Sequence, residues 1–244
     1  MSTTSGNIAF GTELWYVPRS GARTRIGEIA NIDGVEVGAE SEELTNHEST
    51  DRYREFRQGL RDAGAISVTA NHVAGDDGQA AVASHFHADT RGGREYMEIV
   101  FPDGWGLHCD AVCTAWRPGD APVDGKIEFS AGYKLSGKPH SGFRATGLTT
   151  PFFVLSEGND TVSPARASGT YAYTASVANG VTSLTITPTS AAGDSIYVQG
   201  EAVDSGDASS AITLAVGANV LTVVVYQDGK LPARYQITVT RADE

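Results

Sequence analysis

Side chains that could bind a metal ion lie near the middle of the chain. His85 and His87 are two residues apart in a segment with a helical pattern. Residues two apart on a helix point about 200° away from each other, so this pair cannot share one ion. Cys109 and Cys113 have the spacing of one strand face, and His108 falls on the opposite face. Because a zinc site needs converging ligands and no second cysteine pair is present, we predict packing or solvent-facing roles for these side chains.

Acidic residues could support calcium binding or hydrolysis. Asp76-Asp77-Gly78 and Asp204-Ser205-Gly206-Asp207 resemble fragments of calcium loops, but neither has the full ligand spacing with a closing glutamate. Glycoside hydrolysis needs two carboxylates in a cleft, and with 30 acidic residues in the chain some pair always exists. The sequence also contains no nucleophile elbow, phosphate-binding loop or dinucleotide fingerprint. We therefore expect turn residues at both aspartate clusters, and no catalytic, metal-binding or cofactor-binding residues; we do not expect an enzyme.

The charge balance argues against a surface that grips nucleic acid. The chain has 30 acidic and 18 basic residues, a formal net charge of -12, and both of its halves are acidic. A protein that holds DNA needs clustered lysine and arginine. Cys109 and Cys113 would lie ~13 Å apart at ~3.3 Å per residue, too far for a disulfide, which suggests buried thiols in a reducing compartment. Residues 1–7 lack an apolar core and no apolar run is long enough for a bilayer, so we expect no signal peptide and no membrane insertion.

The elements that would position these groups begin with a strand, a helix and a second strand. Residues 65–73 alternate apolar and polar side chains, which is typical of a half-buried strand. Residues 76–90 change to a helical pattern, with Val82 and Phe86 predicted on one face. Residues 94–101 alternate again, and two further alternating segments follow. This order predicts a sheet with a single helix packed on it.

A charged insert precedes this strand–helix–strand unit. Residues 38–58 carry many charges of both signs without a clear strand or helix period, and a short helical turn is compatible with residues 50–56. A long polar segment of this kind is either mobile or docked on a partner.

The second half of the chain differs from the first in composition and in the spacing of its predicted strands. Residues 137–149 are rich in Gly, Ser and Thr and predict a linker. Beyond them tryptophan and cysteine are absent, and short strand candidates recur with turn signals between them. About seven short strands in roughly 95 residues are typical of an antiparallel β-sandwich.

This second half resembles the bacterial cadherin-like β-sandwich family, which has an immunoglobulin-like fold. The segments that carry the resemblance are Leu155-Ser156, Thr161-Val162-Ser163-Pro164, Tyr173-Thr174-Ala175-Ser176-Val177, Leu184-Thr185-Ile186-Thr187-Pro188, Val198-Gln199-Gly200, Leu214, Gly217-Ala218-Asn219, Val223-Val224-Val225 and Tyr235-Gln236-Ile237-Thr238-Val239-Thr240-Arg241. The calcium-ligand motifs of true cadherins are absent. Such modules are appended to many surface-displayed proteins, so the resemblance implies a fold but little about function.

The first half is similar to the major tail tube protein of long, non-contractile-tailed (lambda-type) bacteriophages. The resemblance depends on the order of its features, which are an apolar strand, the acidic insert closing in Arg52–Asp62, the block Gly59-Leu60-Arg61-Asp62-Ala63-Gly64, the strand–helix–strand unit, Phe101-Pro102-Asp103-Gly104-Trp105 and Asp124–Pro139. A tube domain followed by an immunoglobulin-like domain is a known arrangement in that family.

The two resemblances together imply a mainly β protein. Residues 1–140 would be a tail tube domain, a barrel-forming sheet with one packed α-helix, residues 141–150 a linker, and residues 151–244 the immunoglobulin-like sandwich. Copies would assemble into hexameric rings stacked as a tube, the conduit for phage DNA during ejection. The implied partners are other copies, a tape measure protein, a tail terminator and DNA in passage, with weak host-surface glycan contact by the outward-facing sandwich. The protein would be assembled in the bacterial host cytoplasm and reside in the virion tail.

Two groups of residues are candidates for these roles. Contact between subunits or rings is expected from Glu42, Glu43, His47, Glu48, Arg52, Arg54 and Arg57, because adjacent blocks of opposite charge suit docking between copies. Channel lining is expected from Glu98, Asp110 and Glu128, which fall on predicted solvent-facing sides of strands. An acidic or neutral wall would let a duplex slide, since DNA carries about one negative charge per ~1.7 Å. Against this, Lys126 and Lys134 share a face with Glu128.

Other functions remain open at this stage. One is a surface carbohydrate-binding or adhesion protein, which the sandwich supports. Another is the tube subunit of a related contractile injection device. The sequence does not identify the host, the ring size, the acids that face a lumen or any ligand of the second domain.

Overall fold

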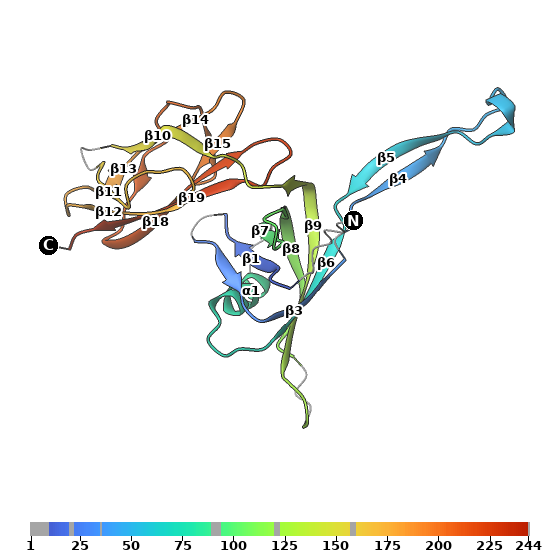
Figure 1. Cartoon of the computed structure of the whole chain (residues 1–244), viewed down its shortest axis with the longest axis horizontal. Coiled ribbons are helices and arrows are strands. Elements are labelled where there is room, and N and C mark those ends of the chain that lie inside the picture. The colour runs from blue at the N-terminus through green and yellow to red at the C-terminus, as the bar shows by residue number, and fades with distance from the viewer. Residues whose placement is uncertain are drawn as a thin grey trace, which may run out of the picture. The chain divides into compact units, whose positions relative to one another are not determined.

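The computed structural model describes residues 10–19, 22–34, 36–88, 94–119, 123–156 and 160–243 (Figure 1). These residues are mainly in strands, with one α-helix, which confirms the predicted fold class. The chain divides into two compact units. The first contains Met1–Thr24, Glu98–His108 and His140–Glu244, and the second contains Arg25–Met97 and Cys109–Pro139. The unit boundaries fall within or beside three strands, β7 (Arg94–Val100), β8 (Gly106–Arg117) and β9 (Glu128–Gly142).

A seven-stranded sheet runs in the order β2-β1-β7-β8-β9-β6-β3. Its other strands are β1 (Glu13–Val17), β2 (Thr24–Ile26), β3 (Ile29–Asp33) and β6 (Ala65–Asn71). In the second unit β6 pairs antiparallel with both β3 and β9, and Val68 faces Ile32 on one side and Ala131 on the other. The predicted alternation is confirmed, because Ile66, Val68 and Ala70 are buried while Ser67 is exposed.

The single helix, α1 (Asp77–His87), lies within residues 76–90, the segment with the predicted helical pattern. The Asp76 carboxylate accepts a hydrogen bond from the backbone N–H of Gln79 at 2.8 Å. Gly78 lets the first turn approach the backbone at residues 25–26, since a Cβ there would lie 2.2 Å from the Arg25 carbonyl oxygen. Val82 is buried, whereas Phe86, four residues further on, is 37% exposed. Its ring lies beside those of His87 and Trp116.

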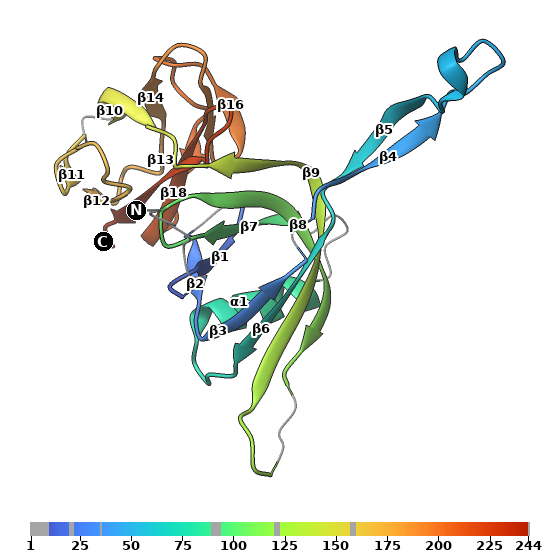
Figure 2. The same ribbon diagram turned by 45° about the vertical axis from the view of Figure 1, so that its right-hand side comes forward.

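The charged insert forms a β-hairpin, which we call the arm, made of β4 (Gly38–Glu43) and β5 (Phe56–Asp62) around the 3-10 turn Thr50–Arg52. Figure 2 shows the arm as a two-stranded ribbon that extends beyond the β3–β6 pair of its own unit. The two strands were not predicted, because the sequence shows no clear period there, whereas the short helical turn considered for residues 50–56 is present at Thr50–Arg52. The arm lacks an alternating pattern because nearly all of its residues are exposed, so no face selects apolar side chains.

The C-terminal part of the first unit is the predicted sandwich. A six-stranded sheet has the order β11-β12-β19-β18-β15-β16, and two further pairs are β10-β14 and β13-β17. The strands are β10 (Leu148–Leu155), β11 (Val162–Ser163), β12 (Ala172–Val177), β13 (Ser183–Leu184), β14 (Ile186–Ser190), β15 (Ser195–Val198), β16 (Glu201–Val203), β17 (Ile212–Thr213), β18 (Gly217–Tyr226) and β19 (Ala233–Arg241). Its buried cluster draws on residues from Ala145 to Val239.

The segment expected to be a linker is packed over part of its length. β9 continues to Gly142, and Ala145 and Leu148 belong to the buried cluster of the sandwich. The Ala145 N–H donates to the Leu231 carbonyl at 2.8 Å, and the Leu148 N–H donates to the Tyr235 hydroxyl at 2.9 Å. The division into residues 1–140, 141–150 and 151–244 stays a prediction.

Candidate functional site

Glu98 occupies the centre of a buried charge cluster in the first unit. The residue is 3% exposed, and its neighbours in β7, Met97 and Ile99, are also buried. The expectation that Glu98 lies on a solvent-facing side of its strand is therefore wrong. β7 is covered on both faces at this point, and a strand with two covered faces does not offer its polar side chains to solvent.

Two arginines and a histidine surround the Glu98 carboxylate. Arg144 donates from both terminal nitrogens, with Nη1 3.4 Å from Oε2 and Nη2 bonded to Oε1. Arg23 Nη1 donates to Oε1 at 3.2 Å, and His108 Nδ1 lies 3.5 Å from Oε2. Arg144 Nη1 also donates to the Pro232 carbonyl at 2.8 Å. A buried carboxylate is tolerated only with such partners.

The surrounding groups keep the Glu98 carboxylate ionised. Burial alone would raise the pKa of Glu98, but the hydrogen bonds with His108 and Arg144 and the charge of Arg144 outweigh burial and lower that pKa to about 2. Burial lowers the pKa of Arg23, whose guanidinium also lies 4.1 Å from the centre of the Trp15 ring. A carboxylate held ionised by two arginines is a weak proton acceptor, so this geometry suits structural attachment better than acid–base chemistry.

The arm carries charges of both signs in contact across its two strands. Glu42 faces Arg57 in the β4–β5 register and forms an ion pair with it, and Glu43 pairs with Arg54 at 3.6 Å. The side chains in these two pairs are between 45% and 73% exposed. The other predicted contact residues, His47, Glu48 and Arg52, are exposed at the far end of the arm. All seven predicted contact residues thus lie on this one hairpin.

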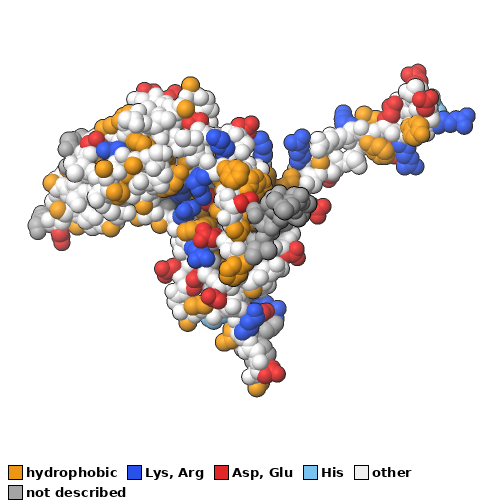
Figure 3. Space-filling view, in the orientation of Figure 1, with side chains coloured by type: hydrophobic (Ala, Val, Ile, Leu, Met, Phe, Trp, Pro, Cys, Tyr) orange, Lys and Arg blue, Asp and Glu red, His pale blue; other side chains and the backbone are white. Residues whose placement is uncertain are grey.

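Apolar side chains accompany these charges. Leu44, Tyr53, Phe56 and Leu60 are exposed on the arm, Tyr53 by 77% and Leu60 by 82%. Figure 3 shows hydrophobic and charged side chains of both signs interspersed along it. Sequence reasoning used the charges and missed these apolar groups, although Leu44, Tyr53 and Phe56 lie within the charged segment, residues 38–58. Several exposed apolar side chains among charges are typical of a surface that another protein covers.

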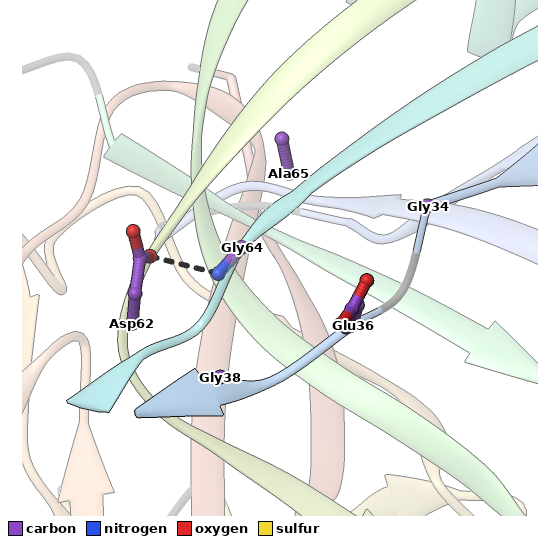
Figure 4. A pocket seen from close by; sticks show the side chains of 6 residues that line it. All are labelled: Gly34, Glu36, Gly38, Asp62, Gly64 and Ala65. Atoms are coloured by element: carbon purple, nitrogen blue, oxygen red, sulfur yellow. Dashed lines mark hydrogen bonds between the residues drawn. The ribbon is translucent and has the colours of Figure 1, made fainter. Parts of the chain in front are cut away.

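A pocket lies at the base of the arm (Figure 4). It is lined by Gly34, Glu36, Gly38, Asp62, Gly64 and Ala65. Asp62 accepts from the Gly64 N–H at 2.8 Å and from Lys134 Nζ at 2.7 and 2.8 Å, and these bonds lower its pKa, Lys134 more strongly than Gly64. Gly64 has a φ of +81°, and a Cβ there would lie 2.2 Å from the Glu36 carbonyl oxygen. Glycine is therefore required where the arm joins β6.

The two other predicted channel residues differ in exposure. Asp110 is half-buried in β8, and Glu128 is exposed at the start of β9, where it pairs with Lys126 at 3.3 Å. A role for either in a channel stays a prediction.

The residues first considered for chemistry are not brought together. Among the described residues no group of three or more His, Cys, Asp or Glu side chains is placed to hold a metal ion. Burial raises the pKa of Cys109 to about 11 and also raises that of Cys113, so neither thiol is activated. Asp204 and Asp207 close a turn through the Asp207 N–H and the Asp204 carbonyl, as predicted. No helix in the described ranges is long and apolar enough to cross a membrane.

Sequence reasoning missed Arg23 and Arg144. Arg144 lies in the predicted linker, and Arg23 lies before the first strand predicted from alternation. They lie 75 and 46 residues from Glu98 in sequence, so no local pattern links them to it.

Comparisons with known proteins match each half of the chain to a separate family. A family profile described as the lambda phage tail tube protein matches residues 12–140, and a profile described as a cadherin-like beta sandwich domain matches residues 156–242. No curated protein matches the chain.

Several solved structures are similar to about half of the chain. A protein in the tail of an empty gene transfer agent particle, refined with C6 symmetry, has 17% identity and a TM-score of 0.44 over 53% of this chain and 94% of its own. A protein in the virion of a native gene transfer agent has 14% identity and a TM-score of 0.44, over 56% and 98%. A sheath/tube terminator structure of an extracellular contractile injection system contains a chain with 7% identity and a TM-score of 0.46, over 57% and 99%.

Proposed function

The chain belongs to the lambda phage tail tube protein family, and on that premise we propose that its copies form hexameric rings that stack into a hollow tube. It is a structural tail tube subunit whose place is the virion tail. The observation that carries the proposal is the family match over residues 12–140, which is more than half of the chain.

Two features of the described chain support assembly through this region. The seven-stranded sheet ends at β3, an edge strand, and a second copy could pair with such an edge. The arm pairs only its own two strands in a separate sheet and exposes both charges and apolar groups. We propose that the arm contacts a neighbouring subunit or ring through Glu42, Glu43, His47, Glu48, Arg52, Arg54 and Arg57, with Tyr53 and Leu60 supplying apolar contact.

The tube would serve as the conduit for DNA during ejection. Glu128 is the best candidate for its wall because it is exposed, and Asp110 is a second. Glu98 is not part of the proposed wall, because its side chain is buried. An acidic wall repels the phosphate backbone and keeps the duplex from binding. In this proposal the subunit has no catalytic role, its other partners are a tape measure protein and a tail terminator, and the sandwich faces outward, where weak contact with host-surface glycans would take place.

Electron microscopy of the purified full-length chain tests assembly. We expect rings and tubes with six-fold symmetry in class averages, and a lumen wide enough for a duplex. A folded chain that stays monomeric at millimolar concentration by sedimentation would overturn the proposal. The matched variants Arg54→Glu and Lys230→Glu both reverse one positive charge, the first on the arm and the second in the sandwich. Only the arm variant should prevent or slow tube formation.

A further inference from the structure

The Glu98 cluster connects segments from both family matches within the first unit. Glu98 and His108 lie in the range matched by the tail tube profile, and Pro232 lies in the range matched by the sandwich profile. Arg144, from the segment between β9 and β10, bonds to both the Glu98 carboxylate and the Pro232 carbonyl. One guanidinium therefore bridges the two regions.

Backbone contacts hold the same loop of the sandwich. Leu231 is fully buried, its N–H donates to the Phe143 carbonyl at 3.0 Å, and its carbonyl accepts from Ala145 at 2.8 Å. Arg234 Nη2 donates to the Pro18 carbonyl at 2.7 Å. Gly106 also fits closely here, since a Cβ on it would lie 3.1 Å from a Leu231 methyl carbon. The loop between β18 and β19 is thus bonded to residues 143–145, and the start of β19 is bonded to Pro18.

We propose that Glu98 is a positioning residue that, through Arg144, clamps the sandwich to the tail tube segments of its own unit, which include Arg23, Glu98 and His108. The alternative is a module on a free linker, as the composition of residues 137–149 had predicted. The clamp rests on the proposed division of the chain into a tube domain and a sandwich, but it is independent of whether rings form.

The sandwich can keep its own fold when the clamp opens. Its buried cluster includes described residues from Ala145 to Val239 and none from β7 or β8. Loss of the Glu98 charge would leave two arginines without their carboxylate, which favours opening of the clamp. The amides of Ala145 and Leu231, next to Arg144 and Pro232 in the chain, and amides in the middle of the sandwich sheet should then respond differently.

Hydrogen exchange of the full-length chain tests the clamp. In Glu98→Gln we expect the amides of Ala145 and Leu231 to exchange on the order of 100-fold faster, while the amide of Ile237 inside the sandwich stays within about twofold. Asp160→Asn is the matched control, because Asp160 forms an ion pair with Arg166 inside the sandwich. This control should leave the amides of Ala145 and Leu231 unchanged.

Two results would overturn the clamp. One is unchanged exchange at Ala145 and Leu231 in Glu98→Gln, and the other is an equal increase at Ile237, which would make Glu98 a general stabiliser. If Glu98→Gln does not fold, Arg144→Lys keeps the positive charge but loses the paired geometry, and the same ratio of exchange rates is measured. Failure to form tubes would leave this ratio unaffected, so the two proposals fail separately.

Discussion

The Glu98 cluster and the arm are built from the same residue types but differ in burial. In the cluster, one carboxylate side chain that is 4% exposed is shared by two arginines and a histidine. In the arm, each carboxylate pairs with one arginine, and all four side chains are substantially exposed. Removing one partner from a buried pair leaves an uncompensated charge, whereas water replaces a lost partner at the surface. The buried ions therefore fix the fold, and the exposed ones are available to a neighbour.

The largest expected effect comes from the same substitution made in both places. Glu98→Gln should lower the free energy of unfolding of the part of the chain outside the sandwich by about 3 kcal/mol, because the arginines lose their charge partner in a buried site. Glu42→Gln, the matched change on the arm, should cost less than about 0.5 kcal/mol. Urea denaturation followed by tryptophan fluorescence measures both, since Trp15, Trp105 and Trp116 all lie outside the sandwich. Equal costs for the two variants would contradict the contrast in burial.

Acid should weaken the buried cluster. The pKa of Glu98 is lowered from 4.5 to about 2 in the folded chain, so its stabilisation is present above pH ~4.5 and is lost as the pH falls toward 2. About 2 kcal/mol of it should be lost between pH 7 and pH 3. The measurement is the difference in unfolding free energy between the wild-type chain and Glu98→Gln at each pH. Asp62 is present in both chains, so its own lowered pKa cancels in this difference. A difference that stays constant down to pH 3 would refute the assigned shift.

Strands with one buried face could be predicted from the sequence, whereas the fully exposed strands of the arm could not. β6 was predicted closely because buried apolar side chains alternate there, and the cap at Asp76 has a local mechanism. The arm strands were missed because a hairpin with no buried face carries no alternation. β18 starts at Gly217, although Gly217 and Asn219 are residue types that favour turns. Its pairing with β19, where Gly217 faces Arg241, overrides that local preference.

The candidate site was predictable only where its residues are close in sequence. The charged residues of the arm lie within one segment, so composition was sufficient to find them. The alternation rule placed Glu98 on the solvent-facing side of its strand. The rule assumes that only one face of the strand is covered, but both faces of β7 are covered at this point. Arg23 and Arg144 reach Glu98 only through tertiary packing, for which a single sequence contains no local signal.

A substitution at the base of the arm should have an effect on stability between those of the buried and the exposed charge variants. Gly64→Ala should destabilise the chain by about 1–3 kcal/mol or redirect the arm, because φ is +81° and the new Cβ would meet the Glu36 carbonyl. Gly38→Ala is the matched control in the same pocket, since a Cβ there meets nothing within 4 Å. Urea denaturation and the rate of tube formation by light scattering should separate the two. If Gly64→Ala behaves as Gly38→Ala does in both assays, the base of the arm does not set its direction.

The smallest effect on the subunit itself is expected at the exposed pair of the arm. Exchanging the two residues, Glu42→Arg with Arg57→Glu, keeps the cross-strand attraction and should change the unfolding free energy by less than about 0.5 kcal/mol, measured below the assembly concentration. The exchange nevertheless reverses the charge pattern that the arm presents. If a neighbouring copy recognises that pattern, tube formation should slow strongly, and added salt should reduce the difference from the wild-type chain because it screens exposed charges. If assembly is unchanged at low salt, the ion pair merely joins β4 to β5, and recognition must come from the apolar side chains such as Tyr53 and Leu60. The buried and exposed charges would then both be internal supports, and the contrast between them would be one of strength alone.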